Sequence, residues 1–397
     1  MHLKWYFYEN PFFKRIFLEK RRKEAQMRGY LILEDGTVFQ GKFHGEEKET
    51  LCEVVFTTGM MGYEETVTDP SFEGQGVVLT YPMIGNYGSN AEDMESKQPW
   101  ISALIVRELS GFPSNYRNEE PFQDFLARHG ITVLSGIDTR ALTRKLRDAG
   151  TMNGLVTWQL PEDISLRLEE IRKYQVRHSV IRVSRKHPET VGKGRRKVSL
   201  IDFGAKDNIV RSLVARDCAV TVWPWDTPAY VILDSNPDGI MLSNGPGDPK
   251  ECAPILRHIR ELMDSGIPIF SICLGHQLMA LAAGFDTTRL KFGHRGCNHP
   301  VMDLATRKVY MSSQNHGYCV KPDTVDPAIA EISHVNVNDG SVEGLRFKGR
   351  PVSSVQFHPE ASPGPRETAY LFDDFLKQID AAKSGAAGPS VAPKGGL

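Results

Sequence analysis

The side chain with the clearest chemical potential is a cysteine at the end of an apolar segment. Cys273 closes the run Ile267–Ile272, and the helix-like segment from His276 follows after only two residues. A tight strand-to-helix turn exposes its central side chain, and a helix amino terminus favours the thiolate over the thiol. The residue type alone favours a buried, inert cysteine. The strand–turn–helix context instead predicts a nucleophile.

A cysteine nucleophile needs a base, and one histidine lies in a suitable position. His358 ends another apolar segment, P-V-S-S-V-Q-F-H-P-E, and Glu360 lies two residues beyond it. A carboxylate next to an imidazole fixes its tautomer and stabilises its positive charge, as in catalytic triads. A histidine and a glutamate at this spacing are weak evidence alone. With Cys273 upstream, they predict an acyl-transfer triad of Cys273, His358 and Glu360.

A glycine-rich turn follows a third apolar strand. The strand Gly239–Ser243 leads into N-G-P-G-D-P at residues 244–249, whose backbone amides can face an oxyanion. Taken alone, an ordinary Gly/Pro turn explains this segment better. It is not a nucleotide-binding P-loop, since no Lys-Ser/Thr follows the glycines, and G-x-x-x-x-G-K-[ST] occurs nowhere in the sequence. ATP chemistry would therefore require a different fold or a different subunit.

A second cluster contains residue types that can bind a metal ion. His294, Cys297 and His299 offer three potential ligands within six residues. Zinc sites, however, usually draw a second pair of ligands from elsewhere, and no pair at matching spacing occurs. The sequence therefore predicts no metal site.

Length and composition limit the class of protein. The chain has 397 residues, of which 40% are hydrophobic and 24% charged, as expected for a soluble protein of two domains. A formal net charge of −1 gives no global attraction to nucleic acid or an anionic membrane. No apolar run approaches the ~18 residues that span a bilayer. Six scattered cysteines without a C-x-x-C pair favour a reducing cytoplasm over a disulfide scaffold or zinc ribbon.

The pattern of expected strands and helices divides the chain into two domains, a linker and a tail. Residues 29–183 combine short β-rich runs with two helical segments, which predicts an α+β domain. Residues 184–197 are polar and basic and predict a linker; a nucleic-acid patch is less favoured, because no aromatic residue interleaves with the charges. Strands and helices alternate over 198–380, which predicts an α/β domain with an open, mostly parallel sheet covered by helices on both faces. Residues 381–397 are rich in Ala, Gly, Pro and Ser and predict a disordered tail.

The first 28 residues form a basic and aromatic extension, with eight Lys or Arg and three Glu. They lack the uninterrupted apolar stretch of a signal peptide. Three interpretations remain open. The segment is dispensable, translation begins at Met27, or an amphipathic helix docks on a partner or a membrane surface.

The motifs resemble the class I, or triad, glutamine amidotransferases. The segments that carry this resemblance are Gly245–Pro249, Cys273–Gln277 and His358–Glu360. More narrowly, the chain is similar to the small, glutaminase subunits of carbamoyl-phosphate synthetase. The segments that match this family are Lys291–Gly296, Gln314–Gly317, His358–Gly364, Leu33–Gly36, Gly62–Ser71, Leu79–Pro82 and Ile84–Gly88.

The resemblance implies a reaction. Cys273 would attack the side-chain amide of L-glutamine, expelling ammonia and leaving a γ-glutamyl thioester that water cleaves, while His358 moves the protons. Backbone amides of Gly247 and Leu274 would form the oxyanion hole. The residues expected to hold the glutamine are Ser71, Gly245, Gln277, Asn315, Gly317 and Tyr318. Ser71 belongs to the first domain, which implies a glutamine site at the domain interface.

The resemblance also implies a partner. Ammonia would pass to a large synthetase subunit, which uses ATP, Mg and bicarbonate to make carbamoyl phosphate for arginine and pyrimidine synthesis. This chain itself would bind no cofactor. Two alternatives belong to other classes: a stand-alone glutaminase, which gives the first domain no purpose, and a non-catalytic regulatory module, which would not need the triad.

Overall fold

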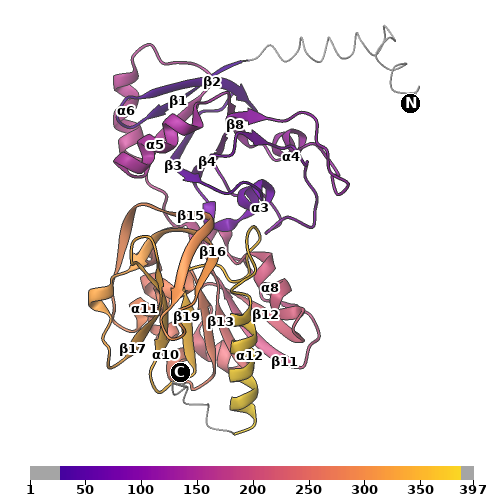
Figure 1. Cartoon of the computed structure of the whole chain (residues 1–397), viewed down its shortest axis with the longest axis vertical. Coiled ribbons are helices and arrows are strands. Elements are labelled where there is room, and N and C mark those ends of the chain that lie inside the picture. The colour runs from indigo at the N-terminus through magenta and orange to yellow at the C-terminus, as the bar shows by residue number, and fades with distance from the viewer. Residues whose placement is uncertain (1–26, 386–397) are drawn as a thin grey trace, which may run out of the picture.

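The computed structural model describes residues 27–385, which form two domains (Figure 1). The expected extension 1–28 lies outside the described residues except for Met27 and Arg28, and Arg28 already begins the first strand. No helix among the described residues is both long enough and apolar enough to cross a bilayer.

The first domain is built on a closed β-barrel. Its strands follow the order β1-β2-β8-β6-β4-β3-β9, and pairing of β1 with both β2 and β9 closes the barrel. Alternate side chains point inward and are fully buried, as for Leu31 and Val54. The bounds are β1 (Arg28–Leu33), β2 (Val38–His44), β3 (Thr50–Thr57), β4 (Gln75–Leu79), β6 (Ala103–Ile105), β8 (Thr132–Ser135) and β9 (Met152–Thr157), with β5 (Met83–Ile84) and β7 (Glu108–Leu109) pairing separately.

Helices cover this barrel. They are α3 (Tyr63–Thr68), the 3₁₀ turn η1 (Pro70–Phe72), α4 (Phe122–Arg128), α5 (Thr139–Ala149) and α6 (Ile164–Lys173). Helix α5 begins where Asp138 caps it by accepting a hydrogen bond from the Ala141 amide at 2.9 Å. Its Leu142 and Leu146 pack into the barrel core. The combination of a mixed barrel with separate helices agrees with the predicted α+β class.

The second domain contains a ten-stranded sheet in the order β10-β12-β11-β13-β14-β19-β18-β17-β15-β16. Its strands are β10 (Glu189–Val191), β11 (Arg196–Asp202), β12 (Cys218–Pro224), β13 (Gly239–Leu242), β14 (Ile269–Ile272), β15 (Thr287–Asp303), β16 (Val309–Val320), β17 (Ala330–Asn336), β18 (Val342–Phe347) and β19 (Val352–Val355).

The expectation of a mostly parallel sheet is wrong for half of this sheet. Strands β12, β11, β13, β14 and β19 are parallel, as their near-continuous apolar sequences predict. From β19 onward the pairs β19–β18, β18–β17, β17–β15 and β15–β16 are antiparallel. These strands mix exposed polar and buried positions, because part of their surface faces solvent or the first domain.

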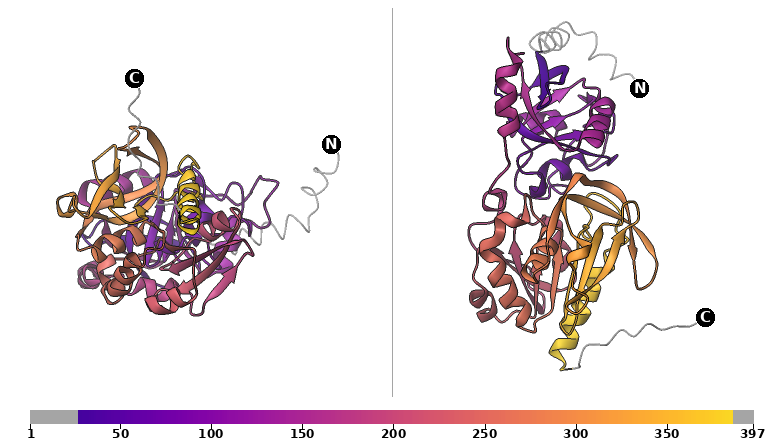
Figure 2. Two further views of the ribbon diagram at one scale, coloured as in Figure 1. Left: turned by 90° about the horizontal axis from the view of Figure 1, so that it is seen from below. Right: turned by 90° about the vertical axis from the view of Figure 1, so that its left-hand side faces the viewer.

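Helices lie on both faces of the parallel strands, as predicted (Figure 2). On one face α8 and α12 pack against Met241 and Phe270, and on the other α9, α10 and α11 pack against Ile240 and Leu242. The helices of this domain are α7 (Ser179–Val183), α8 (Asp207–Val214), α9 (Ala229–Asp234), η2 (Pro249–Ile255), α10 (Leu256–Asp264), α11 (Leu274–Ala282), η3 (Pro322–Thr324) and α12 (Tyr370–Lys383).

Two predicted boundaries need correction. The segment 184–197 is not a free linker, since it contains β10, which pairs antiparallel with β12 at the sheet edge. The preceding α7 also belongs to the second domain, because its Val180 lies in the core around β11 and β13. The expected tail 381–397 begins too early, because α12 continues through Lys383; residues 386–397 lie outside the described part.

The two domains meet where β15 and β16 reach the barrel (Figure 1). The Thr151 amide donates to the carbonyl oxygen of Lys291 at 2.9 Å, and the Thr58 amide donates to that of Arg295 at 3.4 Å. On the α8 side, the Asp207 amide donates to the Glu95 carbonyl oxygen at 2.8 Å. Backbone hydrogen bonds thus join the domains on either side of the interface.

Candidate active site

The turn that carries Cys273 is strained. Cys273 lies between β14 and α11 with φ 53° and ψ −105°, a positive φ that a non-glycine residue rarely adopts. Its amide donates to the Val355 carbonyl oxygen at 2.8 Å, which ties the turn to the neighbouring strand β19. The thiol therefore projects from the carboxyl edge of the sheet at the amino terminus of α11. This is the turn that the sequence predicts.

His358 and Glu360 follow β19, the strand next to β14. Nδ1 of His358 lies 2.6 Å from Oε1 of Glu360, and both side chains are buried. Because the carboxylate can only accept, Nδ1 carries the proton in this hydrogen bond. Nε2 has no hydrogen-bond partner among the described residues and is the ring nitrogen left to serve Cys273, whose charge acts on this imidazole. The structure thus brings the three predicted catalytic residues together.

Charge stabilises this arrangement. Burial alone would lower the pKa of His358, but the Glu360 carboxylate and the charge of Cys273 outweigh it and raise the pKa. Burial would raise the pKa of Glu360, and His358 and Lys206 together lower it. Nζ of Lys206 lies 3.3 Å from Oε1 of Glu360 in the buried interior. The surroundings therefore favour the imidazolium form of His358 and the carboxylate form of Glu360.

Two other histidines near Cys273 have hydrogen-bond partners other than a carboxylate. His276 lies on α11, and its Nδ1 is 2.8 Å from Oγ of Ser354. Burial lowers its pKa to about 3, so it stays neutral. His316 lies on β16 with its Nδ1 2.8 Å from the carbonyl oxygen of Tyr318. Among these three histidines, His358 is the one with a glutamate partner and a pKa that responds to the charge of Cys273.

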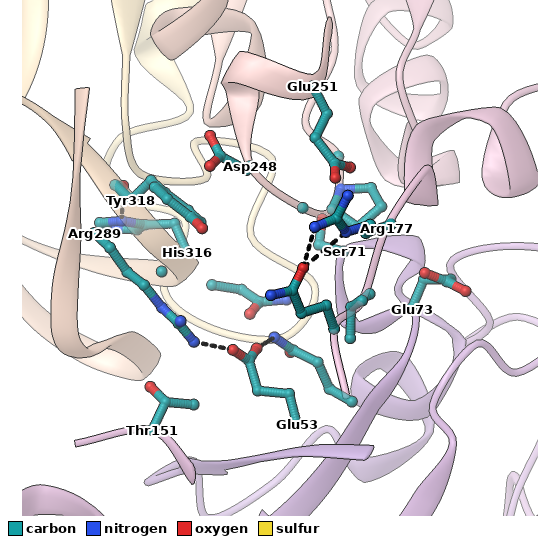
Figure 3. Close-up of a pocket in the computed structure, with 18 of the residues that line it drawn as sticks. Glu53, Ser71, Glu73, Thr151, Arg177, Asp248, Glu251, Arg289, His316 and Tyr318 are labelled. Atoms are coloured by element: carbon teal, nitrogen blue, oxygen red, sulfur yellow. Dashed lines mark hydrogen bonds and ion pairs between the residues drawn. The ribbon is translucent and has the colours of Figure 1, made fainter. Parts of the chain in front are cut away.

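A polar cavity of about 630 Å³ opens in front of Cys273, between the two domains (Figure 3). Its volume falls within the usual range for small-molecule sites. The residues predicted from sequence to hold glutamine line it, with the exception of Leu274: Ser71, Gly245, Gly247, Gln277, Asn315, Gly317 and Tyr318. His358 and Glu360 are not among the residues that line the cavity.

The loop that follows β13 presents its backbone to this cavity. Gly245 has no room for a side chain, because a Cβ would lie 2.3 Å from the Phe203 carbonyl oxygen. Gly247 has φ 89°, a conformation that favours glycine. No hydrogen bond from the amides of Gly247 or Leu274 is found among the described residues, so both donors remain available. The oxyanion hole expected from these two amides stays a prediction.

The first domain contributes to the cavity through η1. Oγ of Ser71 accepts a hydrogen bond from Nδ2 of Asn244 at 2.8 Å. Oδ2 of Asp69 accepts one from Nδ2 of Asn315 at 3.0 Å. Both contacts cross the domain interface and are buried, so the cavity exists only when the domains are docked.

Gln277 is oriented by its own hydrogen bonds. Its Nε2 donates to the Tyr318 carbonyl oxygen at 2.7 Å and to Oε1 of Gln356 at 3.0 Å. A side-chain amide has two N–H donors, and both are used here. The Gln277 side chain therefore offers only its oxygen, an acceptor, to a molecule in the cavity.

Several residues that line the cavity are not indicated by the sequence patterns. Arg289 of β15 forms an ion pair with Glu53 of β3 across the domain interface, and Gln75 donates to Oε2 of Glu53 at 2.7 Å (Figure 3). Arg295 is buried in the wall and donates to the Phe292 carbonyl oxygen at 2.8 Å. Glu53, Gln75 and Arg289 lie in strands without a local motif, and Arg295 lies in the matching segment Lys291–Gly296, whose pattern indicates no role for it, so only the tertiary contacts identify them.

Comparisons with known proteins match both halves of the chain. The family model for glutamine amidotransferase class-I matches residues 199–378. The model for the carbamoyl-phosphate synthase small chain, CPSase domain, matches residues 31–156.

Individual relatives cover almost the same span. The carbamoyl phosphate synthase small chain of Clostridium perfringens is 50% identical over 88% of this chain and 99% of its own length. That of Bacillus cereus is 51% identical over 89% and 96%, and that of Listeria monocytogenes is 48% identical over 89% and 98%. The chain therefore belongs to the carbamoyl phosphate synthase small chains, with a class I glutamine amidotransferase domain as its second half.

Proposed function

We propose that this chain is the glutaminase subunit of a carbamoyl phosphate synthase. It hydrolyses L-glutamine and delivers the ammonia to a large subunit, which uses ATP and bicarbonate to form carbamoyl phosphate. The observation that supports this most strongly is the buried Cys273–His358–Glu360 arrangement at the base of an interdomain cavity. Neither alternative accounts for both the triad and the first domain.

The proposed chemistry has two steps. The Cys273 thiolate attacks the side-chain carbonyl carbon of glutamine, while the amides of Gly247 and Leu274 stabilise the oxyanion. Protonated His358 donates its proton to the departing nitrogen, which leaves as ammonia. Neutral His358 then deprotonates a water molecule, which cleaves the thioester to glutamate and restores the thiolate and the imidazolium.

The cavity explains how free glutamine would be held. The oxygen of Gln277 is suited to accept from the α-ammonium group, because both of its amide hydrogens are already engaged. Ser71 and Asn315 supply polar groups from opposite domains. Closure by the Glu53–Arg289 ion pair would link substrate binding to the docking of the domains.

Label transfer tests the delivery of ammonia. The chain is combined with a carbamoyl phosphate synthase large subunit, ATP, Mg²⁺, bicarbonate and glutamine labelled with ¹⁵N in its amide, in the presence of unlabelled ammonium. We expect carbamoyl phosphate to carry mostly ¹⁵N. A product that follows the isotope ratio of the bulk ammonium would mean that the chain releases ammonia to solution, as a stand-alone glutaminase does.

Glu360→Gln is expected to change the pH profile of glutamine hydrolysis. The carboxylate raises the pKa of His358, so its removal lowers that pKa and the imidazolium is lost at a lower pH. We expect kcat/KM to fall at least about tenfold and its alkaline limb to move to lower pH. The exposed Glu367→Gln serves as the control and should leave the profile in place. An alkaline limb that does not move in Glu360→Gln would contradict the assigned contact.

Ser71→Ala is expected to raise the KM for glutamine. Loss of one buried hydrogen-bonding group to a charged substrate corresponds to about 1.4 kcal/mol, or about a tenfold increase in KM, with a smaller change in kcat. Steady-state kinetics measures this, and Ser110→Ala in a loop of the first domain is the control. An unchanged KM would show that the first domain does not contribute to the glutamine site.

A further inference from the structure

The fold assembles a second cluster of ligating side chains at the wall of the cavity, which His316 itself lines. His294 of β15, His316 of β16 and Glu343 of β18 are all buried, and each offers a ligand atom within 4.8 Å of the others. The sequence indicated no metal site, because His294, Cys297 and His299 have no second ligand pair nearby in the chain. The antiparallel half of the sheet supplies that pair from β16 and β18.

Hydrogen bonds orient both imidazole rings toward one point. Nε2 of His294 lies 2.8 Å from Oδ2 of Asp339, and Nδ1 of His316 lies 2.8 Å from the Tyr318 carbonyl oxygen. Both partners are acceptors, so each of these ring nitrogens carries a hydrogen. The opposite nitrogens, Nδ1 of His294 and Nε2 of His316, lie 3.1 and 2.7 Å from the same side-chain oxygen of Gln314.

Glu343 adds a buried carboxylate, and one of its two oxygens lacks a hydrogen-bond partner among the described residues. Its Oε1 accepts a hydrogen bond from Nδ2 of Asn336 at 3.1 Å and lies 3.6 Å from Nδ1 of His294. Its Oε2 has no hydrogen-bond partner among the described residues, although the side chain is fully buried. A buried carboxylate oxygen without a partner is costly, and a cation would remove that cost.

We propose that His294, His316 and Glu343 bind one divalent transition-metal ion, with zinc as the ion that fits best and the oxygen of Gln314 as fourth ligand. Two imidazole nitrogens and a carboxylate are typical zinc ligands. Metal-binding histidines commonly donate their other N–H to a carboxylate or a backbone carbonyl, which are the partners provided by Asp339 and Tyr318.

Metal binding requires shifts in both directions: the ligand atoms of His294, His316 and Glu343, now within 4.8 Å of one another, would move closer, and the oxygen of Gln314, now 2.7 Å from Nε2 of His316, would move away. Bonds of about 2.0–2.2 Å in a tetrahedron place neighbouring ligand atoms about 3.4 Å apart. Nδ1 of His294 and Oε1 of Glu343 are already 3.6 Å apart. Because protein groups would fill all four positions, the site is structural. An ion there would join β15, β16 and β18 directly behind Asn315 and Gly317, which line the cavity.

Zinc binding to the full chain tests this site independently of glutamine hydrolysis. The titration uses Cys273→Ser, because the catalytic thiolate and His358 would themselves bind zinc. After treatment with a chelator, we expect one equivalent of Zn²⁺ to bind in competition with a chromophoric chelator. Adding Glu343→Gln should weaken binding at least tenfold, whereas adding the control His258→Gln on α10 should not. Absence of a bound equivalent, or equal affinities in both variants, would overturn the proposal.

X-ray absorption at the zinc edge provides a test that does not depend on how Glu343→Gln folds. Zinc-loaded Cys273→Ser protein should show a four-coordinate shell of nitrogen and oxygen with the scattering pattern of two imidazoles. A sulfur atom in the shell, or a shell without imidazole, would place the ion elsewhere and refute this site.

Discussion

Replacing Cys273 with serine is expected to abolish glutamine-dependent carbamoyl phosphate synthesis in the complex with the large subunit, while synthesis from free ammonia continues. Removal of the nucleophile of a catalytic triad costs about 10⁴-fold or more in kcat, since the members act as a unit. The serine oxygen lacks the low pKa that lets a thiol ionise. In the proposed function the large subunit alone forms carbamoyl phosphate from ammonia, ATP and bicarbonate. Ammonia supplied in solution therefore bypasses the defect.

The matched control is Cys297→Ser, which also removes one thiol but changes a residue outside the triad. Both variants are assayed with glutamine and with ammonium under the same conditions. Retained glutamine use in Cys273→Ser would refute the assignment of the nucleophile. Loss of both activities in that variant would mean that the substitution disrupts the assembly rather than the chemistry.

Gly275→Ala is expected to have the second-largest effect, although it changes no catalytic group. A Cβ at this position would lie 2.6 Å from the backbone carbonyl oxygen of Leu242 and 2.7 Å from its Cβ. Neither β13 nor the first turn of α11 can yield without moving the adjacent Cys273. We expect about 2 kcal/mol lower stability and about a 10²-fold loss of glutamine hydrolysis.

This prediction opposes helix propensity. Alanine within a helix is favoured over glycine by about 1 kcal/mol, so steric overlap must exceed that gain. Gly111→Ala is the control, because the nearest atom to its added Cβ is 3.8 Å away. Denaturant unfolding and steady-state kinetics measure both effects. An increase in stability with unchanged activity would show that the packing of α11 on β13 does not position the nucleophile.

The sequence predicts the parallel half of the second domain well, because those strands are buried on both faces. Their apolar runs end at Cys273 and near His358, and adjacent parallel strands bring their carboxyl ends together. The triad could therefore be predicted from local patterns alone. The residues expected to bind the substrate glutamine came from the family resemblance, and all of them except Leu274 line the cavity.

Other features depend on contacts between residues distant in sequence. Lys206 directly precedes α8 in a segment without an obvious motif, and only the fold places its ammonium group beside Glu360. The Glu53–Arg289 ion pair joins two domains. Strand β10 is short, polar and exposed, so its pattern is that of a linker until pairing with β12 is known. Edge strands and interdomain contacts are thus where local patterns fail.

The central claim is most directly tested by measuring glutamine hydrolysis by the purified chain alone and together with a carbamoyl phosphate synthase large subunit, ATP and bicarbonate. We predict slow hydrolysis by the isolated chain, strong stimulation by the complete system, and formation of carbamoyl phosphate in step with glutamate. Fast hydrolysis that is indifferent to the large subunit would contradict this account: the triad would stand, but the chain would act as a free-standing glutaminase.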